Sequence, residues 1–489
     1  MNTILKLSSR QYSLNLKIVN VKENTMPVNS FDDYPMSWKP VLDKESNTPL
    51  YIELADILKT DILEGRLTPG TKLPPQRELA DYLDIHLSTI TRAFKLCEQR
   101  GLICSVVGRG TFISSDAAAL GMLPLHQALD KVIEMGAILP DPDIELQVTD
   151  YLKDIINEPD FYKLLQYAPP TYDSLLIKAA VKWFSYYGIA SSKDNILFSS
   201  GSQNAIYAIL SALFQPGDKI ATSYVTYPGL KVAANSLGIQ VIPLPLFDSE
   251  ITAKSLDYVV KNHDVKGFYL IPDFNNPSSE LMNTNTRKEI AAFCTERKLP
   301  FIEDCIYSLF VPKPLPPISF YAPEYGIVIG STSKILSPGL RLAVIHTPAQ
   351  YYSQIASTLY SIIITPPALM MQLFARIINN GRFNRIRELK IKDVETRNKL
   401  FDSICKDIQS TGNKHCPIRW ISLSSKKNLN PSEAEEDLLN KGIQVFSAPR
   451  FVVGNSEIPK AIRVSLISEH NTESYKKGLM LLNDYINQL

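Results

Sequence analysis

The sequence predicts an α/β protein built from two domains, and three observations favour this architecture. The chain has 489 residues, 45% of them hydrophobic, so it is too long for one ordinary hydrophobic core. Residues 45–114 show helical spacing followed by a hairpin pattern. Residues 141–489 alternate short apolar runs with amphipathic helical stretches, which is typical of a largely parallel sheet covered by helices.

The first domain is predicted to contain three helices and a hairpin. The helices are expected at residues 54–63, 77–83 and 88–99. Ser88 is the expected N-cap of the third helix, and Gly101 ends it. Two β-like segments then flank the glycine-rich tip Gly108-Arg109-Gly110. This order of elements predicts a winged helix-turn-helix.

Spaced motifs across this domain resemble the GntR-type winged helix nearly from end to end. They are Leu73-Pro74-Pro75-Gln76-Arg77-Glu78-Leu79-Ala80, Ser88-Thr89-Ile90-Thr91-Arg92-Ala93-Phe94 and Gly108-Arg109-Gly110-Thr111-Phe112. The resemblance implies that the third helix enters the major groove of double-stranded DNA and that the wing follows the minor groove or the backbone. It assigns DNA contacts to Arg77, Ser88, Thr89, Thr91, Arg92, Gly108, Arg109 and Gly110.

Charge within the domain agrees with this assignment. Residues 50–113 carry eight basic and eight acidic side chains, whereas from His86 onward four basic residues face Glu98 alone, a net charge of +3. Leu87 departs from the family, which commonly places a DNA-reading arginine there, so the preferred operator stays open. The alternative is a winged helix that contacts only protein.

In the second domain, polar residues follow each predicted strand. The strands are expected at residues 196–198, 219–221, 267–271, 300–302 and 326–329. Ligands of open α/β sheets bind at the carboxyl ends of such strands. The residues that follow them are Ser202 and Gln203, Tyr227, Asn276, Asp304 and Tyr307, and finally Ser331, Ser333, Lys334 and Arg341.

These residues suit pyridoxal 5′-phosphate. Lys334 can form an imine, and Asp304 can keep a pyridine nitrogen protonated. Ser202 opens a helix whose N-terminus can hold a phosphate, Tyr227 can stack on the ring, and Asn276 can bond its phenolate oxygen. Each has an ordinary alternative, such as an N-cap, a core aromatic, an Asn-Pro turn or a loop carboxylate. Their occurrence in order at successive strand ends indicates a cofactor site.

With the segment Ala461-Ile462-Arg463-Val464-Ser465, these motifs resemble the fold-type I aminotransferases of class I/II over residues 141–489. The resemblance implies a three-layer α/β/α domain with a mostly parallel sheet and a small C-terminal α+β subdomain. It implies that Lys334 bonds the cofactor covalently, that Arg463 clamps a substrate α-carboxylate, and that Tyr167 reaches the neighbouring subunit's phosphate. The remaining cofactor contacts that it implies are Ser202, Gln203, Tyr227, Asn276, Asp304, Tyr307, Ser331, Ser333 and Arg341.

Two departures from that family lie near the substrate entrance. The usual Asn-Pro-Thr-Gly is Asn276-Pro277-Ser278-Ser279 here, and a usual glycine is replaced near Tyr172. Both concern turnover and substrate shape more than cofactor binding.

A GntR-type winged helix joined to an aminotransferase-like domain resembles the MocR-type transcriptional regulators. The resemblance implies a homodimer in which an amine or amino-acid effector, sensed at Lys334, repositions the DNA-binding modules. One alternative is a working aminotransferase with a fused DNA-binding module. Another is a scaffold without cofactor, which would show no visible absorption.

The rest of the chain adds few constraints. Residues 1–35 are predicted to be disordered or extended, and residues 115–140 to form a linker. The early basic residues faintly resemble a transit peptide; the favoured alternative is an extended or mis-assigned start, with Met26 as the true first residue. A net charge of +1 gives no sign of overall polyanion binding, and six cysteines without metal-type spacing are typical of a cytoplasmic protein. The apolar stretch 360–378 contains Pro366-Pro367 and Arg376, which argues against a membrane span.

Overall fold

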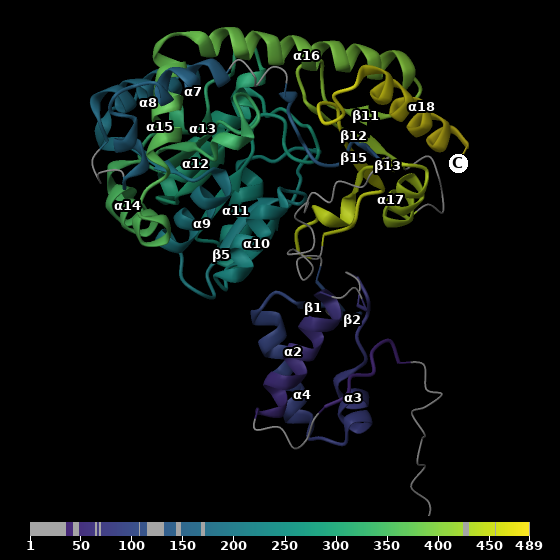
Figure 1. Ribbon diagram of the computed structural model, residues 1–489. Helices are drawn as coiled ribbons and strands as arrows, with labels where there is room; N and C mark the ends of the chain where they lie inside the picture. The colour runs from purple at the N-terminus through teal and green to yellow at the C-terminus, as the bar shows by residue number, and fades with distance from the viewer. Residues whose placement is uncertain are drawn as a thin grey trace, which may run out of the picture.

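The computed structural model describes residues 36–42, 48–63, 66–67, 70–106, 108–114, 132–142, 148–167, 172–423, 430–454 and 456–488. It shows a winged-helix domain, a large α/β domain and a small C-terminal subdomain (Figure 1). The predicted N-terminal extension 1–35 and the linker up to residue 131 lie outside the described residues. Within the described residues, no helix combines the length and the apolar character that crossing a membrane requires.

The winged helix forms as predicted, with one correction. Its elements are α2 (Leu50–Leu63), α3 (Gln76–Leu83), α4 (Leu87–Gln99), β1 (Ile103–Val106) and β2 (Gly110–Ile113), the last two antiparallel. The helices enclose a core that includes Leu58, Leu79 and Phe94. Ser88 is not the N-cap of α4. Asp84 adopts a left-handed conformation at φ 50°, the chain is then extended at His86, and the helix therefore begins at Leu87.

A seven-stranded sheet in the order β4-β10-β9-β8-β7-β5-β6 forms the centre of the large domain. Strand β10 is antiparallel to both neighbours, whereas the pairs from β9 to β6 are parallel. The five predicted strands are confirmed, and β6 and β10 are additional. The bounds are β4 (Ile196–Ser199), β5 (Lys219–Ser223), β6 (Gln240–Leu244), β7 (Gly267–Leu270), β8 (Phe301–Asp304), β9 (Gly326–Ser331) and β10 (Ala343–His346).

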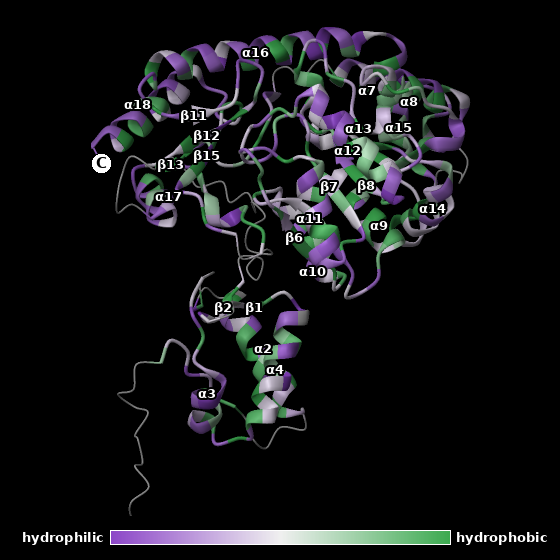
Figure 2. Ribbon diagram, turned by 180° about the vertical axis from the view of Figure 1, so that it is seen from behind, coloured by the Kyte–Doolittle hydropathy of each residue, from purple (hydrophilic) through white to green (hydrophobic). Residues whose placement is uncertain are grey.

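Side chains alternate between the two faces of this sheet, and helices cover both faces, so the domain has three layers. On one face, residues such as Ile302 and Ile329 pack against α9, α10 and α14. On the other, Val328 packs against α8 and α15, and Phe268 packs against α11 and α12. The helices that cover the sheet carry both hydrophobic and hydrophilic residues (Figure 2). The helices are α7 (Thr149–Ile156), α8 (Ser174–Ser185), α9 (Ser202–Leu213), α10 (Pro228–Ser236), α11 (Ala253–His263), α12 (Thr284–Arg297), α13 (Ile318–Tyr321), α14 (Ala349–Ile363) and α15 (Ala368–Asn379).

The long helix α16 (Arg382–Ile404) runs across the top of the molecule and leads into the small subdomain (Figure 1). The subdomain has a four-stranded antiparallel sheet in the order β11-β12-β15-β14 and two helices. Its elements are β11 (Ser410–Thr411), β12 (Ile418–Ser422), α17 (Pro431–Asn440), β13 (Ile443–Gln444), β14 (Phe446–Ser447), β15 (Ala461–Ser465) and α18 (Thr472–Gln488).

The end of the predicted linker belongs to this subdomain. Residues 133–134 form strand β3 (Ile133–Glu134), which pairs in parallel with β13. Ile133 and Met135 are buried in the subdomain's core. The boundary expected at residue 140 therefore lies nearer residue 133, because these apolar side chains complete a core that is distant in sequence.

Gly330, in β9 four residues before Lys334, has no room for a side chain. A Cβ there would lie 2.6 Å from Trp183 Nε1 in the core, so we expect Gly330→Ala to lower the free energy of unfolding by about 1–3 kcal/mol. In the matched control Gly339→Ala, the nearest atom is Ser337 Oγ at 3.6 Å, and the change should stay within about 0.5 kcal/mol. Urea unfolding measures both, and equal values would contradict this packing.

Candidate functional site

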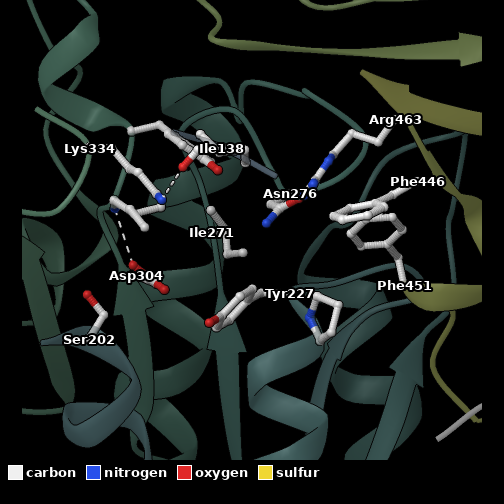
Figure 3. Close-up of a pocket in the computed structure, with 13 residues that line it drawn as sticks. Ile138, Ser202, Tyr227, Ile271, Asn276, Asp304, Lys334, Phe446, Phe451 and Arg463 are labelled. Carbon is white, nitrogen blue, oxygen red and sulfur yellow. Dashed lines mark hydrogen bonds between the residues drawn. The ribbon is translucent and has the colours of Figure 1, made fainter. Parts of the chain in front are cut away.

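A cavity lies at the carboxyl ends of the parallel strands, between the large domain and the small subdomain (Figure 3). Its volume is about 150 Å³. Seven of the residues predicted from sequence line it: Ser202, Tyr227, Asn276, Asp304, Tyr307, Lys334 and Arg463. The sequence analysis missed the apolar lining, to which Ile138, Ile271, Ile306, Phe446 and Phe451 contribute.

Lys334 follows β9 and points into the cavity (Figure 3). Its Nζ donates a hydrogen bond to the carbonyl oxygen of Ile138 at 2.6 Å. Upstream in the same loop, Ser331 Oγ accepts from the backbone N–H of Ser333 at 3.3 Å, and both serines are buried. The backbone that carries the lysine is therefore held in place, and the terminal amine faces the cavity.

Asp304 ends β8 as a fully buried carboxylate. Tyr269 donates its hydroxyl to Asp304 Oδ2 at 2.7 Å, and the backbone N–H of Ile306 donates to Oδ1 at 3.2 Å. Burial raises the pKa of Asp304 to about 6, although these two donors act against the shift. Tyr269 was missed in the sequence, where it reads as one more residue of an apolar strand.

An anion cradle forms where β4 meets α9. Gly201 precedes the helix at φ +87°, and a Cβ there would lie 2.8 Å from the guanidinium of Arg341. The hydroxyl of Ser202, the first residue of α9, is buried without a hydrogen-bond partner among the described residues. A helix N-terminus, an unpaired hydroxyl and an arginine together suit a phosphate dianion. These residues fit pyridoxal 5′-phosphate.

Arg463 lies on the subdomain side of the cavity and is fully buried (Figure 3). Its guanidinium donates to Asn276 Oδ1 at 2.8 Å and to the carbonyl oxygen of Gly136, and it lies over the rings of Phe446 and Phe451. Burial lowers its pKa to about 10, so it stays charged at neutral pH. A buried arginine of this kind is suited to a carboxylate.

Two tyrosines border the cofactor side. Tyr227 precedes α10, and burial raises its pKa to about 12. Tyr307 is buried after β8, and burial raises its pKa as well. Both hydroxyls therefore remain protonated at neutral pH and can act as hydrogen-bond donors. Gln203 supports this wall from behind, because its Nε2 donates to the carbonyl oxygen of Gly229 at 2.8 Å.

The departure at Ser279 has a structural consequence. Ser279 stands where the resemblance leads us to expect glycine, and its backbone is left-handed at φ +61°. A non-glycine residue is strained in that region. Its hydroxyl donates to the carbonyl oxygen of Ile418 at 3.3 Å, which joins the loop to β12 of the subdomain.

The other predicted cofactor residues do not line the cavity. Gln203, Ser331 and Ser333 are buried or half-buried outside the lining, and Arg341 is exposed beside Gly201. Tyr167 is 83% exposed and is not part of the cavity of its own chain.

The predicted DNA contacts gather on α3, α4 and the wing. Arg77, Ser88, Thr91, Arg92 and the wing tip 108–110 are exposed, whereas Thr89 is half-buried. Two of these residues have partners within the domain. Thr91 donates to Gln76 Oε1 at 2.9 Å, and Arg92 lies 4.4 Å from the ring centre of Tyr51.

A further cation, Lys72, lies beside the wing. Its aliphatic end is close to Gly110, and it was not among the predicted contacts. The exposed cations of α4 and the wing therefore gain a neighbour that is distant in sequence.

Comparison with known proteins agrees with this geometry. Residues 133–480 match the family model for aminotransferase class I and II, and residues 50–113 match the gntR family of bacterial regulatory proteins. The chain belongs to the aminotransferase class I and II family and carries a gntR-type DNA-binding domain. This family and the residues of the cavity support pyridoxal 5′-phosphate as the cofactor.

Two relatives of this chain are transcriptional regulators by name. YdeF of Bacillus subtilis (strain 168), an uncharacterized HTH-type transcriptional regulator, is 42% identical over 464 residues, or 95% of this chain and 100% of that protein. PdxR of Corynebacterium glutamicum, an HTH-type pyridoxine biosynthesis transcriptional regulator, is 22% identical and spans 72% of this chain and 77% of its own length.

Solved structures share the fold of the large domain. An archaeal alanine:glyoxylate aminotransferase superposes with a TM-score of 0.68 at 20% identity, covering 77% of this chain and 96% of that one. The kynurenine aminotransferase of Pyrococcus horikoshii gives 0.66 at 22% identity, covering 74% and 92%. The predicted three-layer fold with a mostly parallel sheet is confirmed.

The buried Asp304 should make the stability of the cofactor-free protein depend on pH. Its pKa is about 6 in the fold against 3.8 in the unfolded chain, so its ionisation opposes folding as pH rises through this range. We expect Asp304→Asn to stabilise the cofactor-free protein at pH 7.5 by about 3 kcal/mol and to have little effect near pH 3.5. Denaturant unfolding at both pH values measures this.

Tyr269→Phe is the control, because it removes a donor to the ionised carboxylate and should destabilise at pH 7.5. A destabilised Asp304→Asn variant at pH 7.5 would show that burial does not dominate at this carboxylate.

Proposed function

We propose that the protein is a pyridoxal 5′-phosphate-dependent, DNA-binding transcriptional regulator that senses an amine or amino-acid effector. The observation that carries this proposal is the convergence of Lys334, Asp304 and Arg463 on one cavity in a chain that also carries a winged helix with exposed cations. The family matches for the two domains support it.

Each group in the cavity has a distinct task. When bound, the cofactor supplies an aldehyde that captures amines and a ring that withdraws electrons. Lys334, which lines the cavity, would hold the cofactor through its terminal amine. Asp304 would keep the ring nitrogen of the cofactor protonated, and Arg463 would orient a carboxylate. The lining around Phe446 and Phe451 excludes water.

The second candidate function is a working aminotransferase with a fused DNA-binding module. It is favoured by the presence of Lys334, Asp304 and Arg463, the three groups that such chemistry needs. Slow or partial transamination is expected of a sensor. Steady multiple turnover with a common amino donor would favour the enzyme instead.

A homodimer is part of the proposal. The described segment around Tyr167 exposes apolar side chains, including Tyr162 and Leu165, and Tyr167 itself does not line the cavity of its own chain. In the proposed homodimer, this exposed segment would form a contact in which Tyr167 reaches the phosphate site of a second copy. The regulator would act in the cytoplasm, where its DNA is found.

Lys334→Ala should abolish covalent cofactor binding. We expect the pure protein loaded with pyridoxal 5′-phosphate to absorb visible light and to change its spectrum with a suitable amine, and Lys334→Ala to lose both properties. Lys261→Ala, an exposed position on α11, is the control and should behave as wild type. A wild-type protein that takes up no cofactor would refute the proposed sensor.

DNA binding can be tested at Leu87, which is 40% exposed at the start of α4. Leu87→Arg adds a cation that can reach phosphate, so affinity should rise and the slope of log K against log salt should steepen by about 1. Gel shifts with the DNA upstream of the gene that encodes this protein measure the affinity and its salt dependence. The control variant Asn487→Arg, at the far end of α18, adds the same charge and should leave the DNA affinity unchanged. No wild-type binding at low salt would count against regulation.

A further inference from the structure

A second cavity, here called the edge cavity, lies where β5, β6 and β7 end, near the edge of the central sheet. Its volume is about 280 Å³. Ser223 ends β5, Leu246 follows β6 and Ile271 follows β7, and all three line it. Among the described residues, Ile271 alone lines both this cavity and the one that contains Lys334. The two cavities are therefore neighbours built from different residues.

The lining of the edge cavity is acidic. Glu250 and Glu280 both contribute to it, and none of the described lining residues is basic. Within the described part of the chain, neither carboxylate has an ion-pair partner. Glu280 Oε2 accepts a hydrogen bond from Ser278 Oγ at 2.9 Å, which leaves its charge in place. The cavity thus holds two negative charges that its own residues do not neutralise.

The two carboxylates interact, and the backbone keeps them near each other. Partial burial raises the pKa of Glu280, the hydroxyl of Ser278 acts against this shift, and the charge of Glu250 adds to it. Glu250 is positioned by a tight turn, because the backbones of Phe247 and Glu250 bond each other at 2.9 and 3.0 Å. A cation bound between the carboxylates would relieve their repulsion.

A buried amide oxygen in the same lining lacks a donor. Asn275 is 5% exposed and lines the edge cavity. Its Nδ2 donates to Ser278 Oγ at 2.8 Å and to the carbonyl oxygen of Val225 at 3.3 Å, which fixes the orientation of the amide. Its Oδ1 is buried without a hydrogen-bond partner among the described residues. A buried acceptor left unpaired is unfavourable, so a ligand gains by offering an N–H there.

These features define the chemistry of a ligand. The carboxylates favour a cation, and the amide oxygen favours a cation with N–H donors. Leu246 and Leu281, both partly exposed, and Met282 offer apolar contacts to a short carbon chain. A metal ion fits less well, because the described residues contain no group of three or more His, Cys, Asp or Glu side chains that could hold one.

We propose that the edge cavity binds a small protonated aliphatic amine, with diamines as the preferred class. One ammonium group donates to Glu280 and to Asn275 Oδ1, which lie close together because both side chains bond Ser278. The second ammonium group pairs with Glu250. The site uses neither Lys334 nor the cofactor, so it goes beyond the proposed function and gives the chain a second place where an amine is recognised.

The test uses the full-length protein after treatment with pyridoxal 5′-phosphate and then sodium borohydride. Reduction ties any bound cofactor to Lys334, so an added amine cannot react with it. Calorimetric titration then compares 1,4-diaminobutane with 1,4-butanediol, which has the same length and no charge. We expect saturable binding of the diamine at one site and no binding of the diol. Equal binding of both, or no binding of the diamine at millimolar concentration, would overturn the proposal.

Substitution of the carboxylates locates the site. Glu280→Gln removes the charge and keeps both the size of the side chain and an acceptor for Ser278. Affinity for the diamine should fall by about tenfold or more, as for loss of a charge-assisted hydrogen bond. Glu250→Gln should weaken binding by a smaller factor, because that carboxylate is exposed and screened by salt.

Glu289→Gln is the matched control for these variants. Glu289 is exposed on α12 and does not line the edge cavity, so its substitution removes the same charge and should leave the affinity for the diamine unchanged. Wild-type affinity in both Glu280→Gln and Glu250→Gln would contradict the proposed site.

The same titration separates the edge cavity from the proposed sensor. If the diamine binds the reduced protein and Lys334→Ala equally, the edge cavity stands whether or not the cofactor senses amines. If only the unreduced wild-type protein responds, the amine acts at the cofactor and the edge cavity is not its site. Binding of a lysine-rich peptide without binding of the diamine would indicate a protein partner and would also refute the proposal.

Discussion

The parallel strands β5, β7, β8 and β9 end at one edge of the central sheet, and the site depends on that shared edge. Parallel pairing requires each strand to return through a helix on a face of the sheet, so the residues after successive strands come together. Asp304 and Lys334 are thirty residues apart in sequence and face one cavity for this reason. Loss of the parallel register would separate these groups even if every side chain were kept.

Burial of charge then sets the properties of the site. Asp304 and Arg463 both lie away from water, and their pKa values shift toward the neutral form because desolvation penalises the charged one. Hydrogen bonds from Tyr269 to Asp304 and from Arg463 to Asn276 offset part of that cost. A site arranged in this way gains stability from a ligand of opposite charge, which is a useful property in a sensor.

The small subdomain connects the ligand site to the rest of the chain. It supplies Arg463 and both phenylalanines of the cavity, and it also contains β3, the first described strand after the winged helix. An effector that contacts Arg463 therefore acts on the subdomain to which the DNA-binding domain is attached. Allosteric control requires two states with different effector affinity.

The sequence by itself determined the two domains, the five strands that lead to the site and the identity of the main cavity residues. It could do so because strand ends and glycine-rich turns are local patterns, and because the motifs around Lys334 and Ser88–Phe94 are closely spaced. Only the tertiary structure decided that Ile138, Phe446 and Phe451 line the cavity and that Tyr269 supports Asp304. Apolar residues of this kind have no local signature, since any core needs them. The membership of β3 in the subdomain was likewise settled by pairing with β13, about 310 residues away, a contact that no local pattern encodes.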